Sequence, residues 1–278
     1  MRRAILALGV LGCAPILGGD PARVDAPRVL AVRSEPAEAR PGDAVTLRAL
    51  VASPDGETRT PSWSWCAATR PTAENRVAAE ACLAGRRDAL AALGTAEALD
   101  AVLPSDACAL FGSEPAPAAP GEPPRRAVDP DPTGGYHQPV RVDLSEGEAA
   151  LGRVRLTCAL PDAPAEVARR FAAERRPNAN PRVLSLGLEG LTIVVGWDAA
   201  DAESYLRYER STATLEVRRE VLRVDVYASG ATVGAVNVEA GRATAPVTLD
   251  GDGPPRVWAV LRDDRGGVDW AVLEVPAR

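Results

Sequence analysis

The chain has 278 residues, 46% of them hydrophobic and 25% charged, which is enough for one large or two modest globular domains. It contains no lysine, so lysine chemistry and phosphate-binding loops that end in lysine are excluded. The formal charge of −6 argues against nucleic acid as a partner, because that affinity comes largely from basic side chains that neutralise phosphates.

Residues 1–12 join two arginines to an apolar stretch much shorter than the roughly 20 residues of a bilayer span, and predict a cleaved export signal. Residues 10–13, Val-Leu-Gly-Cys, resemble the lipobox of bacterial lipoproteins. The resemblance implies that Cys13 becomes an acylated N-terminus held in the membrane by two or three acyl chains. Because Ala14 is not Asp, it also implies the outer membrane. An ordinary secretory signal that leaves Cys13 free is the alternative.

The remainder divides into two strand-rich modules. Residues 13–27 are rich in Gly, Pro and Asp and predict a flexible tether. Residues 28–160 predict a first module, with an insertion at about 67–135. Residues 161–180 predict a helical linker, and residues 181–278 a second module that starts with a similar proline-led apolar segment.

Alternating apolar and polar residues predict the strands. In the first module they cover residues 45–51, 62–66, 140–144 and 153–160. In the second module they cover residues 222–227, 235–238 and 247–249. We therefore expect a mainly β protein made of two sandwiches.

A C-terminal hairpin is the clearest element of the second module. Residues 256–261 and 268–275 flank a turn at 263–267, whose two glycines can adopt a positive φ. This pattern resembles the last two strands of Ig-like and PKD-type domains. The resemblance implies an architecture and no particular function, because these folds serve many functions.

The insertion is rich in Ala, Leu and Arg, which predicts short helices at residues 73–84, 95–102 and 105–110. Ser105 is the expected cap of the last helix and Gly112 its stop. A proline-rich stretch follows at 113–132 and predicts an extended chain.

The linker predicts a helix over residues 162–176, with Val167 and Phe171 one turn apart. Four of its residues form a basic surface that we interpret as a solvated helix face: Arg169, Arg170, Arg175 and Arg176.

Four cysteines remain besides Cys13, and an even number in an exported chain predicts two disulfides rather than a metal site. We expect the strands that carry Cys66 and Cys158 to run antiparallel, which would place these two residues at opposite ends of the sheet. The favoured pairing is therefore Cys66 with Cys82 and Cys108 with Cys158, and a nested Cys82–Cys108 bond is the alternative.

Three segments resemble a group of uncharacterised predicted lipoproteins of myxobacteria. These segments are residues 103–112 (LPSDACALFG), 129–140 (DPDPTGGYHQPV) and 178–181 (NANP). The resemblance implies an envelope protein with a cysteine-bearing insertion and Ig-like strands, and it implies no activity.

Candidate catalytic and metal sites are sparse. His137 is the only histidine, so any Ser-His or Cys-His site would have to use it, and we expect a structural role instead. Asp250 and Asp252 are the best calcium candidates, but aspartates that form turns are the commoner explanation for them. No catalytic residue, resident metal or cofactor is predicted.

The five tryptophans bear on carbohydrate binding. Trp63, Trp65 and Trp258 lie in apolar or alternating runs and predict core positions, whereas the sequence leaves Trp197 and Trp270 open. An exposed pair of indoles would indicate a sugar-binding platform.

Together these patterns predict a lipid-anchored cell-envelope protein that acts as a non-enzymatic interaction or structural module, with an envelope protein or a glycan as partner. A glycan-binding sandwich is the alternative, and a hydrolase that uses two carboxylates is a third reading.

Overall fold

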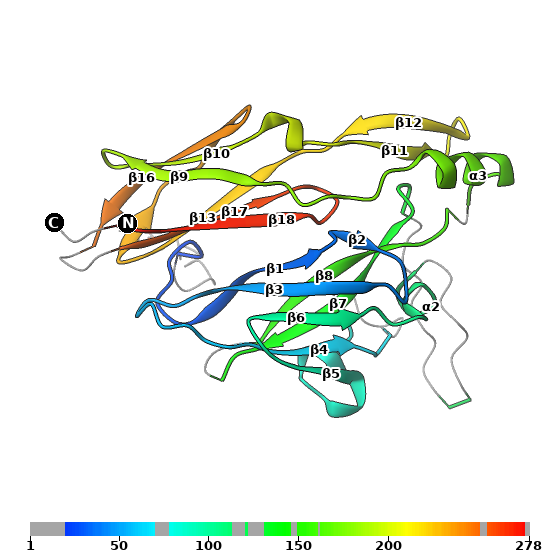
Figure 1. The fold of residues 1–278 in the computed structure, drawn as a ribbon, viewed down its shortest axis with the longest axis horizontal. Helices are drawn as coiled ribbons and strands as arrows, with labels where there is room; N and C mark the ends of the chain where they lie inside the picture. The colour runs from blue at the N-terminus through cyan, green and yellow to red at the C-terminus, as the bar shows by residue number, and fades with distance from the viewer. Residues whose placement is uncertain are drawn as a thin grey trace, which may run out of the picture.

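The structure is a computed structural model that describes residues 20–69, 78–112, 120–121, 131–145, 149–160, 162–250 and 255–275. In these ranges two β-sandwiches lie against each other, and the helix α3 lies at one end of the molecule (Figure 1). The predicted architecture of two Ig-like sandwiches is confirmed by the order in which the strands pair.

The first sandwich contains a three-stranded and a five-stranded sheet. The smaller sheet has the order β1 (Arg28–Glu35), β3 (Ala44–Ala52) and β6 (Ala98–Val102). The larger has the order β2 (Glu38–Ala39), β8 (Ala150–Thr157), β7 (Gly135–Asp143), β4 (Ser62–Cys66) and β5 (Leu90–Thr95). Only β2 and β8 pair in parallel among these strands. In immunoglobulin nomenclature the sheets are A-B-E and A′-G-F-C-C′, which is an Ig-like topology.

The core of the first sandwich forms around β4, as its alternation predicts. Trp63 and Trp65 both point into the core, and each buried indole Nε1 donates to a carbonyl oxygen, 2.8 Å from Ala96 and 3.1 Å from Val102. At the start of β7 the Tyr136 hydroxyl accepts the Asp131 N–H at 3.3 Å. A tyrosine in this place that bonds upstream backbone is a feature of Ig sandwiches.

The second sandwich contains a sheet of β14 (Ala231–Val233), β16 (Arg242–Leu249), β10 (Thr192–Trp197) and β9 (Val183–Glu189), and β15 (Asn237–Glu239) also pairs with β16. The facing sheet contains β13 (Arg223–Ser229), β17 (Arg256–Arg262) and β18 (Val268–Glu274). These sheets correspond to A-B-E-D and C-F-G, the constant-type arrangement. The predicted C-terminal hairpin is the β17–β18 pair, and Gly266 in its turn has a φ of +110°.

The linker forms the predicted helix, α3 (Ala165–Glu174). Its apolar side, with Val167 and Phe171, packs on Leu160 and on Tyr208 of a hairpin inserted in the second module. That hairpin consists of β11 (Ser204–Glu209) and β12 (Thr214–Arg219), and the short helix η2 (Ala199–Asp201) precedes it. Gly134 has a positive φ, and a Cβ there would lie 2.9 Å from the Phe171 ring. The helix therefore depends on a glycine in the first module.

The insertion differs from its prediction. Residues predicted as a helix at 95–102 include all of β6, which pairs with β3, and β5 before it pairs with β4. Hydrogen bonding to the edges of β3 and β4 outweighs the helix propensity of alanine and leucine, because that propensity is only a weak local preference. The described helices of this region are α1 (Glu80–Leu83), η1 (Arg87–Ala89) and α2 (Ala107–Phe111).

The predicted helix ends were partly right. Gly112 does follow the last turn of α2, but the N-cap is Asp106 rather than Ser105, and no side chain caps the helix there. The first part of the helix predicted at 73–84 and most of the proline-rich stretch at 113–132 lie outside the described residues.

The end of the predicted tether is bound to the second module. We call residues 20–25 the strap: Val24 is buried, its N–H donates to the Ala228 carbonyl at 2.8 Å, and the Ala228 N–H donates back to Ala22 at 2.9 Å. Arg23 also pairs with Asp250. The prediction of a flexible tether is therefore wrong for this part, because a single apolar side chain reaches a buried position beside β13.

Candidate functional site

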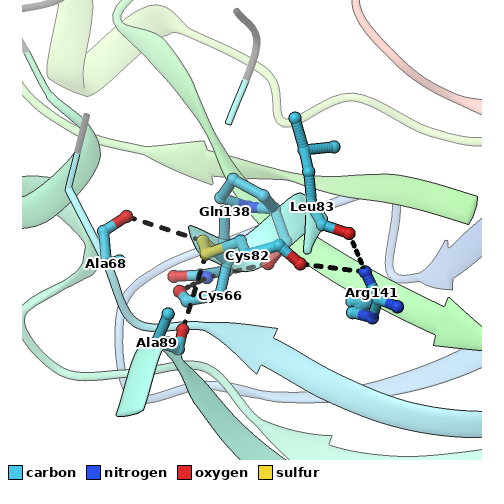
Figure 2. The surroundings of a disulfide bond; sticks show 8 residues. Cys66, Ala68, Cys82, Leu83, Ala89, Gln138 and Arg141 are labelled. Carbon is cyan, nitrogen blue, oxygen red and sulfur yellow. Dashed lines mark hydrogen bonds between the residues drawn. A yellow bond between two sulfur atoms is a disulfide. The ribbon is translucent and has the colours of Figure 1, made fainter. Parts of the chain in front are cut away.

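The two predicted disulfides are present, Cys66–Cys82 with Cα atoms 5.6 Å apart and Cys108–Cys158 with Cα atoms 5.9 Å apart. Polar side chains of β7 support the first one (Figure 2). Gln138 donates Nε2 to the Cys66 carbonyl at 2.8 Å, and Arg141 donates to the carbonyl oxygens of Cys82, at 3.0 Å, and of Leu83. The bond thus fixes α1 to the larger sheet.

The expectation that the strands carrying Cys66 and Cys158 run antiparallel is wrong. β4 and β8 both run antiparallel to β7, so they are parallel to each other, and Cys66 and Cys158 lie at the same end of the sheet. Two strand spacings, about 10 Å, separate β4 from β8. The register adds to this distance, because Cys66 follows Trp65, the partner of Val140, whereas Cys158 follows Thr157, the partner of Gly135. A disulfide needs Cα atoms within about 7 Å, so the intervening strand excludes the Cys66–Cys158 bond.

The two sandwiches meet through an apolar contact. On β3, Val45 and Leu47 face the core of the first sandwich, whereas Leu50 and Ala52 face Trp258 of the second. The alternation of β3 predicted one buried face, but the second module covers the other face as well. β17 is covered on both faces in the same way. The sheet that contains β3 and the sheet that contains β17 are therefore each covered by apolar side chains on both faces, and the two sandwiches form one folded unit.

Beside this contact lies a buried polar cluster that we call the junction network. Its principal side chains come from the first sandwich, the linker and the second sandwich, and are Glu38, Arg155, Arg175, Asn178, Glu203, Glu220, Asp263 and Arg265. Charged side chains are rarely buried unless they are paired.

Glu38 on β2 is the acceptor at the first-sandwich end of the network. Its Oε1 accepts from Arg175 at 2.6 Å and from Thr157 at 3.1 Å, and its Oε2 accepts the Asn178 N–H at 2.8 Å. Arg155 Nε lies 3.5 Å from Oε2. Burial acts to raise the pKa of Glu38, but the two guanidinium groups and the N–H outweigh it, and the pKa is lowered.

Arg155 reaches from β8 to the second sandwich. It donates Nη2 to Thr133 Oγ1 at 2.5 Å and Nη1 to the Arg265 carbonyl at 3.4 Å. Its guanidinium passes over Gly135, where a Cβ would lie 2.0 Å from Nη2. A side chain at position 135 would therefore displace the arginine.

Arg265, in the β17–β18 turn, is the cation of the second sandwich. It donates Nε to Glu220 Oε1 at 2.5 Å and Nη2 to Glu203 Oε2 at 3.1 Å, and its Cζ lies 4.9 Å from the centroid of the Tyr205 ring. Burial raises the pKa of Glu220 to about 7, since the attraction of Arg265 only partly offsets it. Glu220 is thus a buried carboxylate that titrates near neutral pH.

The linker segment Asn-Ala-Asn-Pro joins the two halves. Asn178 donates its N–H to Glu38 and its Nδ2 to Asp263 Oδ2 at 3.1 Å. Asn180 donates Nδ2 to the Ser34 carbonyl at 2.8 Å and accepts the Val268 N–H at 2.9 Å. Two of the three segments behind the myxobacterial resemblance, residues 131–140 and 178–181, therefore build the junction.

Next to the apolar contact is an open cleft of about 380 Å³, which we call the junction cleft. The first sandwich supplies one wall, including Arg48 and the turn at residues 53–59, and the second supplies Trp258, Trp270 and Val272. Three glutamates also line it, of which Glu57 pairs with Arg59 at 3.2 Å and Glu274 with Arg256 at 3.0 Å. The third is Glu97.

The junction has no signature in the sequence. Glu38, Arg155, Glu220 and Arg265 lie far apart in the chain, and no motif or periodicity marks them. The prolines and glycines at 131–139 and the proline at 181 are the available signal. They carry the resemblance described above, and nothing local marks them as the place where two modules meet.

The predicted site residues have these outcomes. Cys13 and Asp252 lie outside the described residues. Asp250 pairs with Arg23 and accepts from the Thr232 hydroxyl at 3.2 Å. Among the described residues no group of three or more His, Cys, Asp or Glu side chains gathers in a way that could hold a metal ion.

His137 points toward the junction. Its Nε2 is buried and has no hydrogen-bond partner among the described residues. Burial, with Arg153 and Arg155 nearby, lowers the pKa of His137 to about 4. The imidazole is therefore neutral at physiological pH.

Four of the five tryptophans are core residues. Trp63, Trp65, Trp197 and Trp258 are buried, and Trp270 is half-buried beside the junction cleft. The exposed pair that would have indicated a sugar platform is not formed, and one accessible indole remains.

Within the described part of the chain, no helix combines the length and apolar character needed to cross a bilayer.

No family model matches the chain, and no curated protein matches it. Among solved structures, a marsupial T cell receptor is similar at 8% identity, with 89% of this chain and 99% of that chain covered and a TM-score of 0.24. That score is too low to support an argument, and the Ig-like assignment rests on the strand pairing alone.

Proposed function

We propose that the protein is an exported, lipid-anchored cell-envelope protein that acts as a rigid, non-enzymatic interaction module. The junction network is the observation that carries this proposal. Its buried ion pairs link both sandwiches and the linker, and removing one partner of such a pair leaves an unpaired buried charge. The two modules are thereby held in one arrangement, which suits a scaffold that presents a fixed surface.

Export is supported by the disulfides. Bonds of this kind persist in oxidising compartments, such as the bacterial periplasm or the cell surface. Pairing also leaves Cys66, Cys82, Cys108 and Cys158 without thiols for nucleophilic chemistry. The buried, neutral His137 is poorly placed for acid–base catalysis.

The strap supports a defined orientation at the membrane. Cys13 and Asp20 are seven positions apart, and seven residues extend at most about 25 Å. The strap and α3 lie at opposite ends of the molecule (Figure 1). An acylated Cys13 would therefore hold the strap end near the bilayer and direct α3 away from it, into the surroundings where a partner binds. In this proposal the membrane is the outer membrane.

Cell fractionation and intact mass together test the anchoring. We expect the wild-type protein in the membrane fraction, with an unreduced mass that corresponds to cleavage before Cys13, acylation and two disulfides. Cys13→Ala should move the protein to the soluble fraction, and the matched exposed-site variant Leu184→Ala should stay in the membrane. An unacylated wild-type protein, or a Cys13→Ala variant that stays with the membrane, would contradict lipid anchoring.

A further inference from the structure

The junction cleft offers a ligand an apolar floor. Trp270 and Val272 lie two residues apart on β18 and face the same side, and Trp258 is the cross-strand partner of Val272. Val272 is 50% exposed although its neighbours on this face are packed against the first sandwich. The first module thus covers only part of this face of the β13–β17–β18 sheet, and leaves Trp270 and Val272 accessible to solvent.

The rim of the cleft is polar but balanced in charge. The lining includes three arginines and three glutamates, and two of the arginines pair with glutamates of the rim: Arg48, Arg59, Arg256, Glu57, Glu97 and Glu274. The Arg256 guanidinium also lies directly on Gly56, where a Cβ would lie 1.6 Å from Nη1. The rim therefore offers both hydrogen-bond donors and acceptors, and ion pairs hold several of these side chains in place. Its positive and negative charges balance, so it has no net charge that would attract an ion.

These features fit a neutral polyhydroxylated ring. Sugar hydroxyls both donate and accept hydrogen bonds, and the apolar face of a sugar ring packs on an indole. The volume of about 380 Å³ falls in the range of small-ligand sites.

We propose that the junction cleft binds a neutral oligosaccharide, with one sugar ring stacked on Trp270 and its hydroxyls bonded to the Arg and Glu side chains of the rim. The inference rests on the proposed function and deepens it by naming the ligand class. Because both sandwiches form the walls, the rigid junction would keep the cleft in its binding shape without the ligand.

Calorimetric titration of the full mature chain, purified with its disulfides intact, tests this site. The probes are tetra-N-acetylchitotetraose and maltotetraose, both neutral, and a neutral decapeptide for comparison. We expect saturable binding of at least one tetrasaccharide. Trp270→Ala should weaken it at least ten-fold, Trp270→Phe less than Trp270→Ala, and Arg48→Ala several-fold, whereas Leu184→Ala should leave it unchanged.

Salt dependence is an independent check. Affinity should change less than two-fold between 50 and 500 mM NaCl, because a neutral ligand gains little from long-range attraction. The proposal is overturned if neither tetrasaccharide binds at 10 mM, if only the decapeptide binds, if Trp270→Ala and Arg48→Ala both leave affinity unchanged, or if the tetrasaccharide is cleaved. Sugar binding by Cys13→Ala separates the two questions, since that variant loses anchoring and should keep the cleft.

Discussion

Arg265 Nε lies 2.5 Å from Glu220 Oε1, and both side chains are buried at the junction of the two sandwiches. The carboxylate shares this one guanidinium with Glu203, and Asp263 is a further negative charge nearby. Burial and crowding of negative charge therefore make protonation of Glu220 favourable near neutral pH.

The titration of Glu220 should make folding stability depend on pH. A pKa of about 7 in the folded state exceeds the usual value of 4.5, so the folded protein binds more protons between these values. Stability contributed by Glu220 is complete below pH 4.5 and is lost as pH rises toward 7, by roughly 3 kcal/mol. Urea unfolding at pH 5, 6, 7 and 8 should show wild type losing roughly this amount of stability relative to Glu220→Gln as pH rises.

The titration of His137 changes folding stability with pH in the opposite direction from that of Glu220. The informative quantity is therefore the difference in unfolding free energy between wild type and Glu220→Gln at each pH. The folded pKa of His137, about 4, is below the usual 6.5, so the contribution of His137 to stability is lost as pH falls from 6.5 toward 4. Both proteins contain His137, and its effect cancels in the comparison. A difference that stays constant from pH 5 to 8 would contradict the buried titration of Glu220.

Glu38 should be the most costly network residue to neutralise. Glu38→Gln leaves Arg155 and Arg175 without their buried carboxylate, and loss of one partner of a buried ion pair typically costs about 3–5 kcal/mol. Glu174→Gln, which breaks the exposed pair with Arg170, is the control and should cost less than about 1 kcal/mol. Equal effects of the two variants on urea midpoints would show that the network adds no stability.

Gly135 and Gly187 are a matched pair of strand glycines. A Cβ at 135 would lie 2.0 Å from Arg155 Nη2, whereas a Cβ at 187 would have nothing within 4 Å. We expect Gly135→Ala to destabilise the protein by about 1–3 kcal/mol by displacing Arg155. Gly187→Ala should be neutral or slightly stabilising. Thermal melts distinguish them, and similar midpoints for both variants would mean that Arg155 relocates freely.

The two disulfides should differ in their contribution. They close loops with sequence separations of 16 and 50 residues. Loop-closure entropy gives about 3 kcal/mol for the shorter and about 4 kcal/mol for the longer. Replacing Cys108 and Cys158 together by alanine should therefore lower the unfolding free energy by about 1 kcal/mol more than replacing Cys66 and Cys82. The reverse order would point to native packing around α1, rather than loop length, as the source of the stabilisation.

The sequence predicted the elements whose signal is local. Alternation identified β3, β4 and the β17–β18 pair, the spacing of Val167 and Phe171 identified α3, and an even cysteine count identified the disulfides. Each of these features depends on the period of one strand or helix, or on the chemistry of one residue type. They were sufficient to predict two β-sandwiches and the exported character of the chain.

Tertiary structure decided the rest, because it depended on partners remote in sequence. The alanine-rich residues 98–102 became a strand only because β3 offered a free edge, and Val24 was buried only because β13 lay beside it. A buried Glu38 or Arg265 looks like any surface charge in the sequence, since its burial is set by the groups that pair with it. The arrangement of the two modules, and the cleft between them, therefore emerges only when the chain has folded.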